Sequence, residues 1–175
     1  MIGLVRSSDT VIPAQFTNSR LQGALIASEI VDLSNQSVRD LKKINDLDRQ
    51  GDFPGALKLV SGVIEKSTEI REKAILLSQE LEGMTLALQG IEPESAREAA
   101  FESISNHLVL IGRLVNYSNY LGELLQVLKS RFSGNFSDGD RVPILVANIN
   151  AEVNEINKLN NQAKEAIERF NELAR

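Results

Sequence analysis

The chain of 175 residues contains no cysteine and no tryptophan, and it has a single histidine and only four prolines. The absence of cysteine excludes a disulfide framework, thiolate metal sites and a cysteine nucleophile. The aromatic share of 5% is low, which is typical of helical bundles and unusual in β-sandwiches and barrels. Basic residues number 19 and acidic residues 24, so the net charge is −5 and the positive surface of a phosphate-backbone binder is missing. The composition therefore argues against nucleic acid as a partner.

Long uncharged runs are absent as well. The longest, such as 103–112 and 142–151, have about half the length that a membrane-spanning helix needs. The apolar side chains of residues 1–16 are interrupted by polar ones, which does not fit the core of a signal sequence. We therefore expect a cytoplasmic protein without a membrane span, in which residues 1–16 are a flexible arm and residues 17–175 form one domain.

The four prolines, Pro13, Pro54, Pro93 and Pro143, are separated by 41, 39 and 50 residues. Because proline is tolerated in the first turn of a helix and disrupts its interior, this spacing indicates helix starts. The last three stand beside residues that suit a helix N-terminus, whereas Pro13 falls a few residues before the expected start of its helix. The sequence predicts an all-α fold, an antiparallel up-down-up-down four-helix bundle, with long helices at about 18–49, 53–88, 94–132 and 141–174.

Heptad periodicity supports this prediction. Positions taken alternately four and three residues apart, starting from Ala56, Ala100 and Val142, are apolar in nine, eight and nine of ten cases. An apolar share of 42% gives only about four of ten by chance, so the pattern is strong in these three segments. The first segment is less regular, and its register is expected to drift between Leu33 and Val38.

Polar residues interrupt the three regular patterns at Ser67, Ser118 and Asn160. If they meet at similar depth, they form a polar layer that fixes the register of the helices, as a buried asparagine does in a coiled coil.

The single imidazole, His107, lies at a position that is expected to face the core. The first interpretation is that His107 is buried and forms a hydrogen bond to a neighbouring helix. Histidine phosphotransfer is an alternative, but it needs an exposed imidazole with a nearby lysine, and apolar residues 108–111 follow here. A small-molecule site is the other alternative, because small side chains could leave a gap beside the imidazole. These small residues are Gly62, Ala74, Gly112 and Ala163.

The sequence carries no motif for catalysis or for a metal. A di-iron bundle needs Glu-x-x-His pairs, and Ile104 stands three residues before His107. The segment 135–140 is rich in oxygen ligands but lacks the spacing and the distal glutamate of a calcium loop, so it is interpreted as a flexible turn with a helix cap. We therefore predict no catalytic residues, no cofactor and no metal, and a protein that is not an enzyme.

Two further stripes are candidates for binding. In the third helix, only Arg113 is charged between Ser103 and Gly122, and a second apolar stripe runs beside the first. Its members are Leu110, Tyr117, Tyr120, Leu124 and Val127. The fourth helix carries an amide stripe, although asparagine is a poor helix former. Its members are Asn150, Asn154, Asn157 and Asn161. Each stripe fits either an ordinary surface of the bundle or contact with a partner helix, and tyrosine suits an interface because it combines apolar area with a polar tip.

The sequence thus predicts a non-catalytic interaction, scaffold or chaperone-like module that binds a helical protein partner or a second copy of itself, which includes a homodimer through the third helix. The alternatives are a sensor-like bundle with a small-molecule site near His107 and phosphotransfer through His107.

Overall fold

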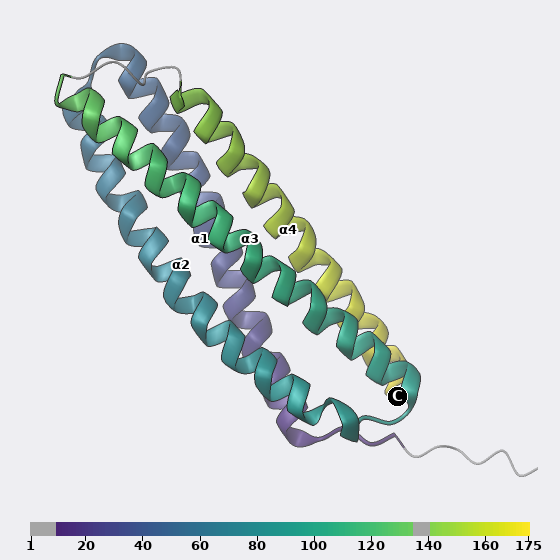
Figure 1. Ribbon diagram of the computed structural model, residues 1–175. Helices are drawn as coiled ribbons and strands as arrows, with labels where there is room; N and C mark the ends of the chain where they lie inside the picture. The colour runs from purple at the N-terminus through teal and green to yellow at the C-terminus, as the bar shows by residue number, and fades with distance from the viewer. Residues whose placement is uncertain (1–9, 135–140) are drawn as a thin grey trace, which may run out of the picture.

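The computed structural model describes residues 10–134 and 141–175. Four long helices follow one another, α1 (Ala14–Gln50), α2 (Phe53–Ala87), α3 (Glu94–Phe132) and α4 (Arg141–Leu173), with a short 3-10 turn η1 (Leu88–Gly90) after α2. They run alternately up and down the molecule (Figure 1). The predicted four-helix bundle is confirmed, whereas the predicted turn at 135–140 lies outside the described residues.

The bundle consists of two tight hairpins that face each other more loosely. α1 packs along α2 and α3 packs along α4, while the contacts of α1 with α4 and of α2 with α3 are far fewer. α2 and α3 lie at the front of Figure 1 and are separated over their middle. They meet again where the ring of Phe53 packs at a tilt against that of Phe132, with ring centroids 5.5 Å apart. The seams between the hairpins are therefore the places where openings are expected.

The helix starts follow from local chemistry. Gly51 ends α1 in the left-handed conformation with φ 77°, which glycine adopts at little cost. Asp52 then caps α2, because its side chain accepts a hydrogen bond from the N–H of Gly55 at 3.0 Å, and Pro54 occupies the first turn. Pro93 directly precedes α3 and Pro143 lies in the first turn of α4.

The start of α1 differs from the prediction. The helix begins at Ala14, four residues earlier than the expected residue 18, so Pro13 marks a helix start like the other three prolines. The reason is a fully buried Phe16, whose ring lies 5.1 Å from that of Phe170 near the end of α4. Arg20 covers the same Phe170 ring, with its guanidinium carbon 5.7 Å from the ring centroid. This contact draws the first turn of α1 into the bundle.

The segment before α1 is tied to the connection between α2 and α3. The N–H of Val11 donates to the carbonyl of Glu92 at 3.2 Å, and the N–H of Glu92 donates back to Val11 at 2.9 Å. Residues 1–9, the greater part of the predicted flexible arm, lie outside the described residues.

The expected drift of register in α1 is wrong. Its buried side follows an unbroken four-three alternation in which two serines occupy core positions. The members are Gly23, Ala27, Ile30, Ser34, Ser37, Leu41, Ile44 and Asp48. Ser34 and Ser37 are fully buried, and the equally buried Tyr117 of α3 lies near the hydroxyl of Ser37, which donates to the carbonyl of Leu33 at 3.0 Å. Small side chains on α1 thus leave room for a large one on α3, a complementarity that a search for apolar residues does not detect.

None of the helices in the described ranges is long and apolar enough to cross a membrane.

Candidate functional site

The second apolar stripe predicted on α3 lies mainly inside the bundle. Leu110, Tyr117, Leu124 and Val127 are buried, and Tyr120 alone is half-buried. Burial raises the pKa of the Tyr117 phenol, and the nearby Ser37 hydroxyl only partly offsets this effect. Leu110, Leu124 and Val127 therefore belong to the core, whereas the buried Tyr117 lines the bottom of a groove between α2 and α3.

The amide stripe on α4 is divided between packing and solvent. The side-chain amides of Asn157 and of Asn35 on α1 donate to each other reciprocally, at 3.1 and 3.2 Å. Asn150 is half-buried, and its Oδ1 atom has no hydrogen-bond partner. Asn154 and Asn161 are exposed. The one amide pair that the stripe forms thus joins α4 to α1 within the same chain and closes part of the seam between the hairpins.

A different face of α3 is exposed and apolar. Phe101, Leu108 and Val115 recur every seven residues with 59%, 54% and 57% of their surface exposed. Gly112 and Gly122 lie on the same side, and a methyl group added at either would meet nothing within 4 Å. We call these five residues the outer face of α3, and the exposed Val109 flanks it.

The outer face of α3 also lacks charge. The exposed residues between Glu102 and Glu123 are all uncharged, and they include the polar side chains of Asn116 and Asn119. Arg113 is half-buried and turns toward α4, where it lies 3.6 Å from Glu152. An outward helix face normally carries charged residues. The low charge of this helix is visible in the sequence, but the predicted second stripe is wrong as the exposed one, because the apolar residues that remain exposed are those outside both predicted stripes.

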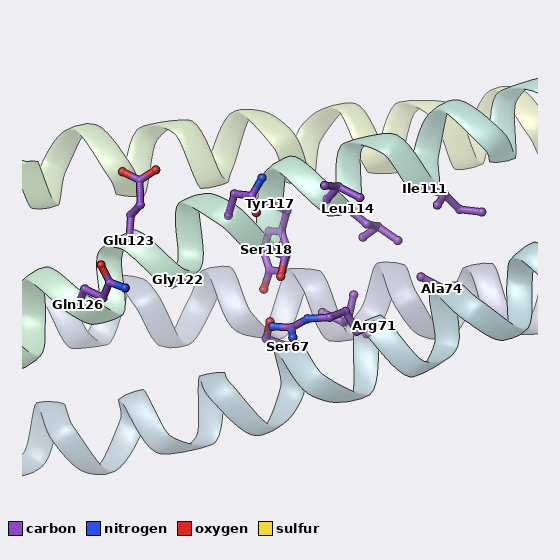
Figure 2. Close-up of a pocket in the computed structure, with 13 residues that line it drawn as sticks. Ser67, Arg71, Ala74, Ile111, Leu114, Tyr117, Ser118, Gly122, Glu123 and Gln126 are labelled. Atoms are coloured by element: carbon purple, nitrogen blue, oxygen red, sulfur yellow. The ribbon is translucent and has the colours of Figure 1, made fainter.

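A groove of about 690 Å³ runs beside this face, between α2 and α3. Val115 and Gly122 form part of its α3 wall, so the groove and the outer face are continuous. Figure 2 shows Arg71 of α2 extending toward Ser67 in the space between the helices, while Glu123 points away from α2. The groove is open and is lined by both apolar and polar side chains, unlike an enclosed active site.

The predicted polar layer forms only in part. Ser67 and Ser118 both line the groove between α2 and α3. Asn160 lies elsewhere, in a smaller cavity beside His107. The heptad pattern of each helix cannot show the depth at which its polar residue meets those of the other helices.

His107 is buried with 7% of its surface exposed, as expected from its position in the pattern. Burial lowers its pKa to about 4, and Lys164 adds to this effect while the backbone of Ser103 opposes it. The expected bond to a neighbouring helix is missing, because Nδ1 has no hydrogen-bond partner of good geometry. An imidazole so enclosed cannot meet a phosphorylated partner domain in this conformation.

The cavity beside His107 measures about 200 Å³. Of the small residues expected to open such a gap, Ala163 lines it. Ala74 lines the groove instead, and Gly112 faces outward.

Across residues 10–134 and 141–175, no group of three or more His, Asp or Glu side chains is placed to hold a metal ion. Comparisons of the chain with protein families, with characterised proteins and with solved structures find no match. The function therefore has to be inferred from the surfaces and cavities of the fold itself.

Proposed function

We propose that this protein is a non-catalytic interaction module whose binding surface is the outer face of α3, and that this face pairs with the same face of a second copy. The observation that carries the proposal is the exposed, uncharged stretch between Glu102 and Glu123, which covers about 30 Å of helix. Exposed apolar side chains that gather on one uncharged face mark interaction sites in soluble proteins.

The heptad spacing of Phe101, Leu108 and Val115 favours a helix as the partner. A partner helix that lies along this row would contact it once every two turns, always with the same side. The two exposed glycines, Gly112 and Gly122, offer the close approach that helix packing needs.

The shape of the outer face favours an antiparallel pair with its two-fold axis near Gly112. This arrangement places the bulky half, Phe101 and Leu108, against the small half, Val115 and Gly122, of the other copy. A two-fold interface must be complementary to itself, and a face that is large at one end and small at the other meets that condition only when the helices are antiparallel.

Charge at the two ends of α3 supports the same orientation. The helix begins with Glu94 and Glu98 and ends with Lys129, all of them exposed. In an antiparallel pair Glu94 and Glu98 of each helix lie near Lys129 of the other, whereas a parallel pair brings these like charges together. Glu102 and Glu123, which would approach each other across the antiparallel pair, each already meet an arginine of α4 within the same chain.

A single helix-to-helix contact buries less than about 1,200 Å², at the low end of specific interfaces. We therefore expect an exchanging dimer with a dissociation constant on the order of micromolar. The protein would then be a reversible pairing element, able to exchange its own copy for another helix with a similar apolar row.

The test is sedimentation velocity over a concentration series from a few micromolar to several hundred micromolar. Leu108→Glu places a charge at the centre of the outer face and should leave a monomer at every concentration. Leu76→Glu, an equally exposed leucine on α2, is the matched control and should associate like the unchanged protein. A monomer at all concentrations for the unchanged protein, or equal association of both variants, would overturn the proposal.

A further inference from the structure

The cavity beside His107 lies at the loose seam between α1 and α4, near the end of the bundle where α1 begins and α4 ends. All four helices contribute to its lining. Gly23 of α1 and Ala163 of α4 are small residues on its wall. A methyl group added at Gly23 would stand 3.6 Å from Leu77 and Glu80 of α2, which is an ordinary van der Waals distance. The backbone of α1 therefore packs closely on α2 at this point.

The deep part of the cavity combines apolar walls with three polar side chains. Leu81 and Met84 supply apolar surface from α2. Ser103, His107 and Asn160 also line it, and all three are more than nine-tenths buried. This combination, an apolar pocket with a few convergent polar groups, is the usual design of a small-molecule site.

Two of these polar groups lack a well-formed hydrogen bond within the protein. Ser103 Oγ has no partner, and His107 Nδ1 has near it only the backbone of Ser103, with which it makes no hydrogen bond of good geometry. They stand one helical turn apart on the same side of α3, so one ligand atom can reach both. A buried polar atom without a partner is costly, and a bound molecule that supplies the missing hydrogen bonds removes that cost.

The charges lie at the mouth and not in the depth. Arg20 of α1 and Lys164 and Glu168 of α4 line the outer part of the cavity. The Arg20 guanidinium donates to Asn171 at 2.9 Å through one terminal nitrogen and covers the Phe170 ring, whereas its buried Nε atom has no hydrogen-bond partner. In the interior the imidazole is uncharged at neutral pH, since burial lowers its pKa to about 4. A ligand whose ionised group reached Ser103 and His107 would therefore lose its hydration beside uncharged groups.

We propose that this cavity binds a small uncharged molecule with an apolar ring and one hydroxyl group, of the phenol class. The hydroxyl can donate to one of the two unpartnered atoms and accept from the other, because both serine and neutral histidine can serve in either role. The volume of about 200 Å³ suits one substituted benzene ring, since a designed apolar cavity of about 150 Å³ holds benzene. The site is separate from the outer face of α3 and does not depend on pairing of the chains.

The lone histidine makes the test direct, because the only imidazole signals in the NMR spectrum belong to His107. Phenol is titrated into the full chain while the imidazole Hε1 shift and the melting temperature are recorded. We expect a saturable shift with a dissociation constant of about 1 mM or below and a rise in melting temperature. Toluene, which lacks the hydroxyl, and benzoate, which is ionised, should each bind at least several-fold more weakly.

Ala163→Leu fills the cavity and should weaken phenol binding at least tenfold, while Ala151→Leu on the exposed side of the same helix should not change it. Ser103→Ala keeps the cavity and removes one hydrogen-bond partner, so it should weaken phenol and leave toluene unchanged. The inference is overturned if phenol produces no saturable shift up to about 10 mM, if benzoate binds better than phenol, or if Ser103→Ala affects neither ring compound. Repeating the titration with monomeric Leu108→Glu separates this result from the proposed pairing.

Discussion

Acidification should destabilise this protein through a single imidazole. Burial lowers the pKa of His107 to about 4 from the ordinary value of 6.5, so the folded protein resists protonation that the unfolded chain accepts. The unfolded state therefore binds more protons between these two values, and the free energy of unfolding falls as pH falls through this window. Above pH 6.5 the contribution is constant and complete.

The magnitude follows from the size of the shift. A difference of 6.5 − 4 pKa units corresponds to about 3 kcal/mol once the pH is below the folded value, and roughly 2 to 3 kcal/mol of this is already lost at pH 4.5. This is a large share of the stability of a typical domain, which is about 5–15 kcal/mol. Acid sensitivity should therefore be visible without complete unfolding.

The assay is urea denaturation followed by far-UV circular dichroism at pH 7.5 and 4.5, on the unchanged protein and on His107→Leu. Carboxylate protonation affects both proteins, so the difference between their pH dependences isolates the imidazole. An NMR titration of the same imidazole in the folded state gives the pKa directly. Titration near 6.5 in the folded protein, or equal loss of stability in both proteins, would refute the reasoning.

Three further substitutions test the packing. Ser37→Leu overfills the space that the buried tyrosine of α3 occupies, so it should lower the free energy of unfolding by about 1–3 kcal/mol in urea denaturation; no loss would show that the space is not filled. Asp48→Ala leaves Arg131 without the carboxylate that it meets at 2.8 Å in a largely buried pair, so it should lower the free energy of unfolding by about 3 kcal/mol. The control Glu123→Ala removes an exposed pair and should cost about 1 kcal/mol or less, and equal costs would contradict this ranking. Gly62→Ala should raise the melting temperature, because alanine favours the helix by about 1 kcal/mol and the added methyl group meets only a lysine end 4.0 Å away; a lower melting temperature would contradict the open environment.

The fold was accessible from the sequence because its signals are local and repeated. Prolines near helix starts and apolar residues at four-three spacing fix where each helix lies and which side it buries. The start of α1 was missed because the contact that extends it, between Phe16 and Phe170, joins the two ends of the chain. The register of α1 was misjudged because two of its buried positions carry serine, and the small Ser37 lies near the large Tyr117 of α3, a relation that exists only between helices.

The candidate sites were accessible only in outline. Low charge on α3 and a buried imidazole at His107 could both be predicted from the sequence. The exposed apolar residues of α3 could not be told from the buried ones by sequence. Helix periodicity gives the angle between two stripes, but it does not show which stripe a neighbouring helix covers. The cavity likewise depends on how loosely α1 meets α4, which is a property of the packed hairpins.

The central claim, an antiparallel pair through α3, can be measured as one distance. Because the chain has no cysteine, Gln126→Cys provides a unique attachment point for a nitroxide label on an exposed turn just beyond the outer face. With the two-fold axis near Gly112, the two labelled positions lie 14 residues on either side of it, or about 42 Å apart along the helices. Pulsed electron spin resonance at a concentration where the dimer forms should give this distance. A separation near 10 Å, as in a parallel pair, or the absence of any coupling between chains would contradict the account.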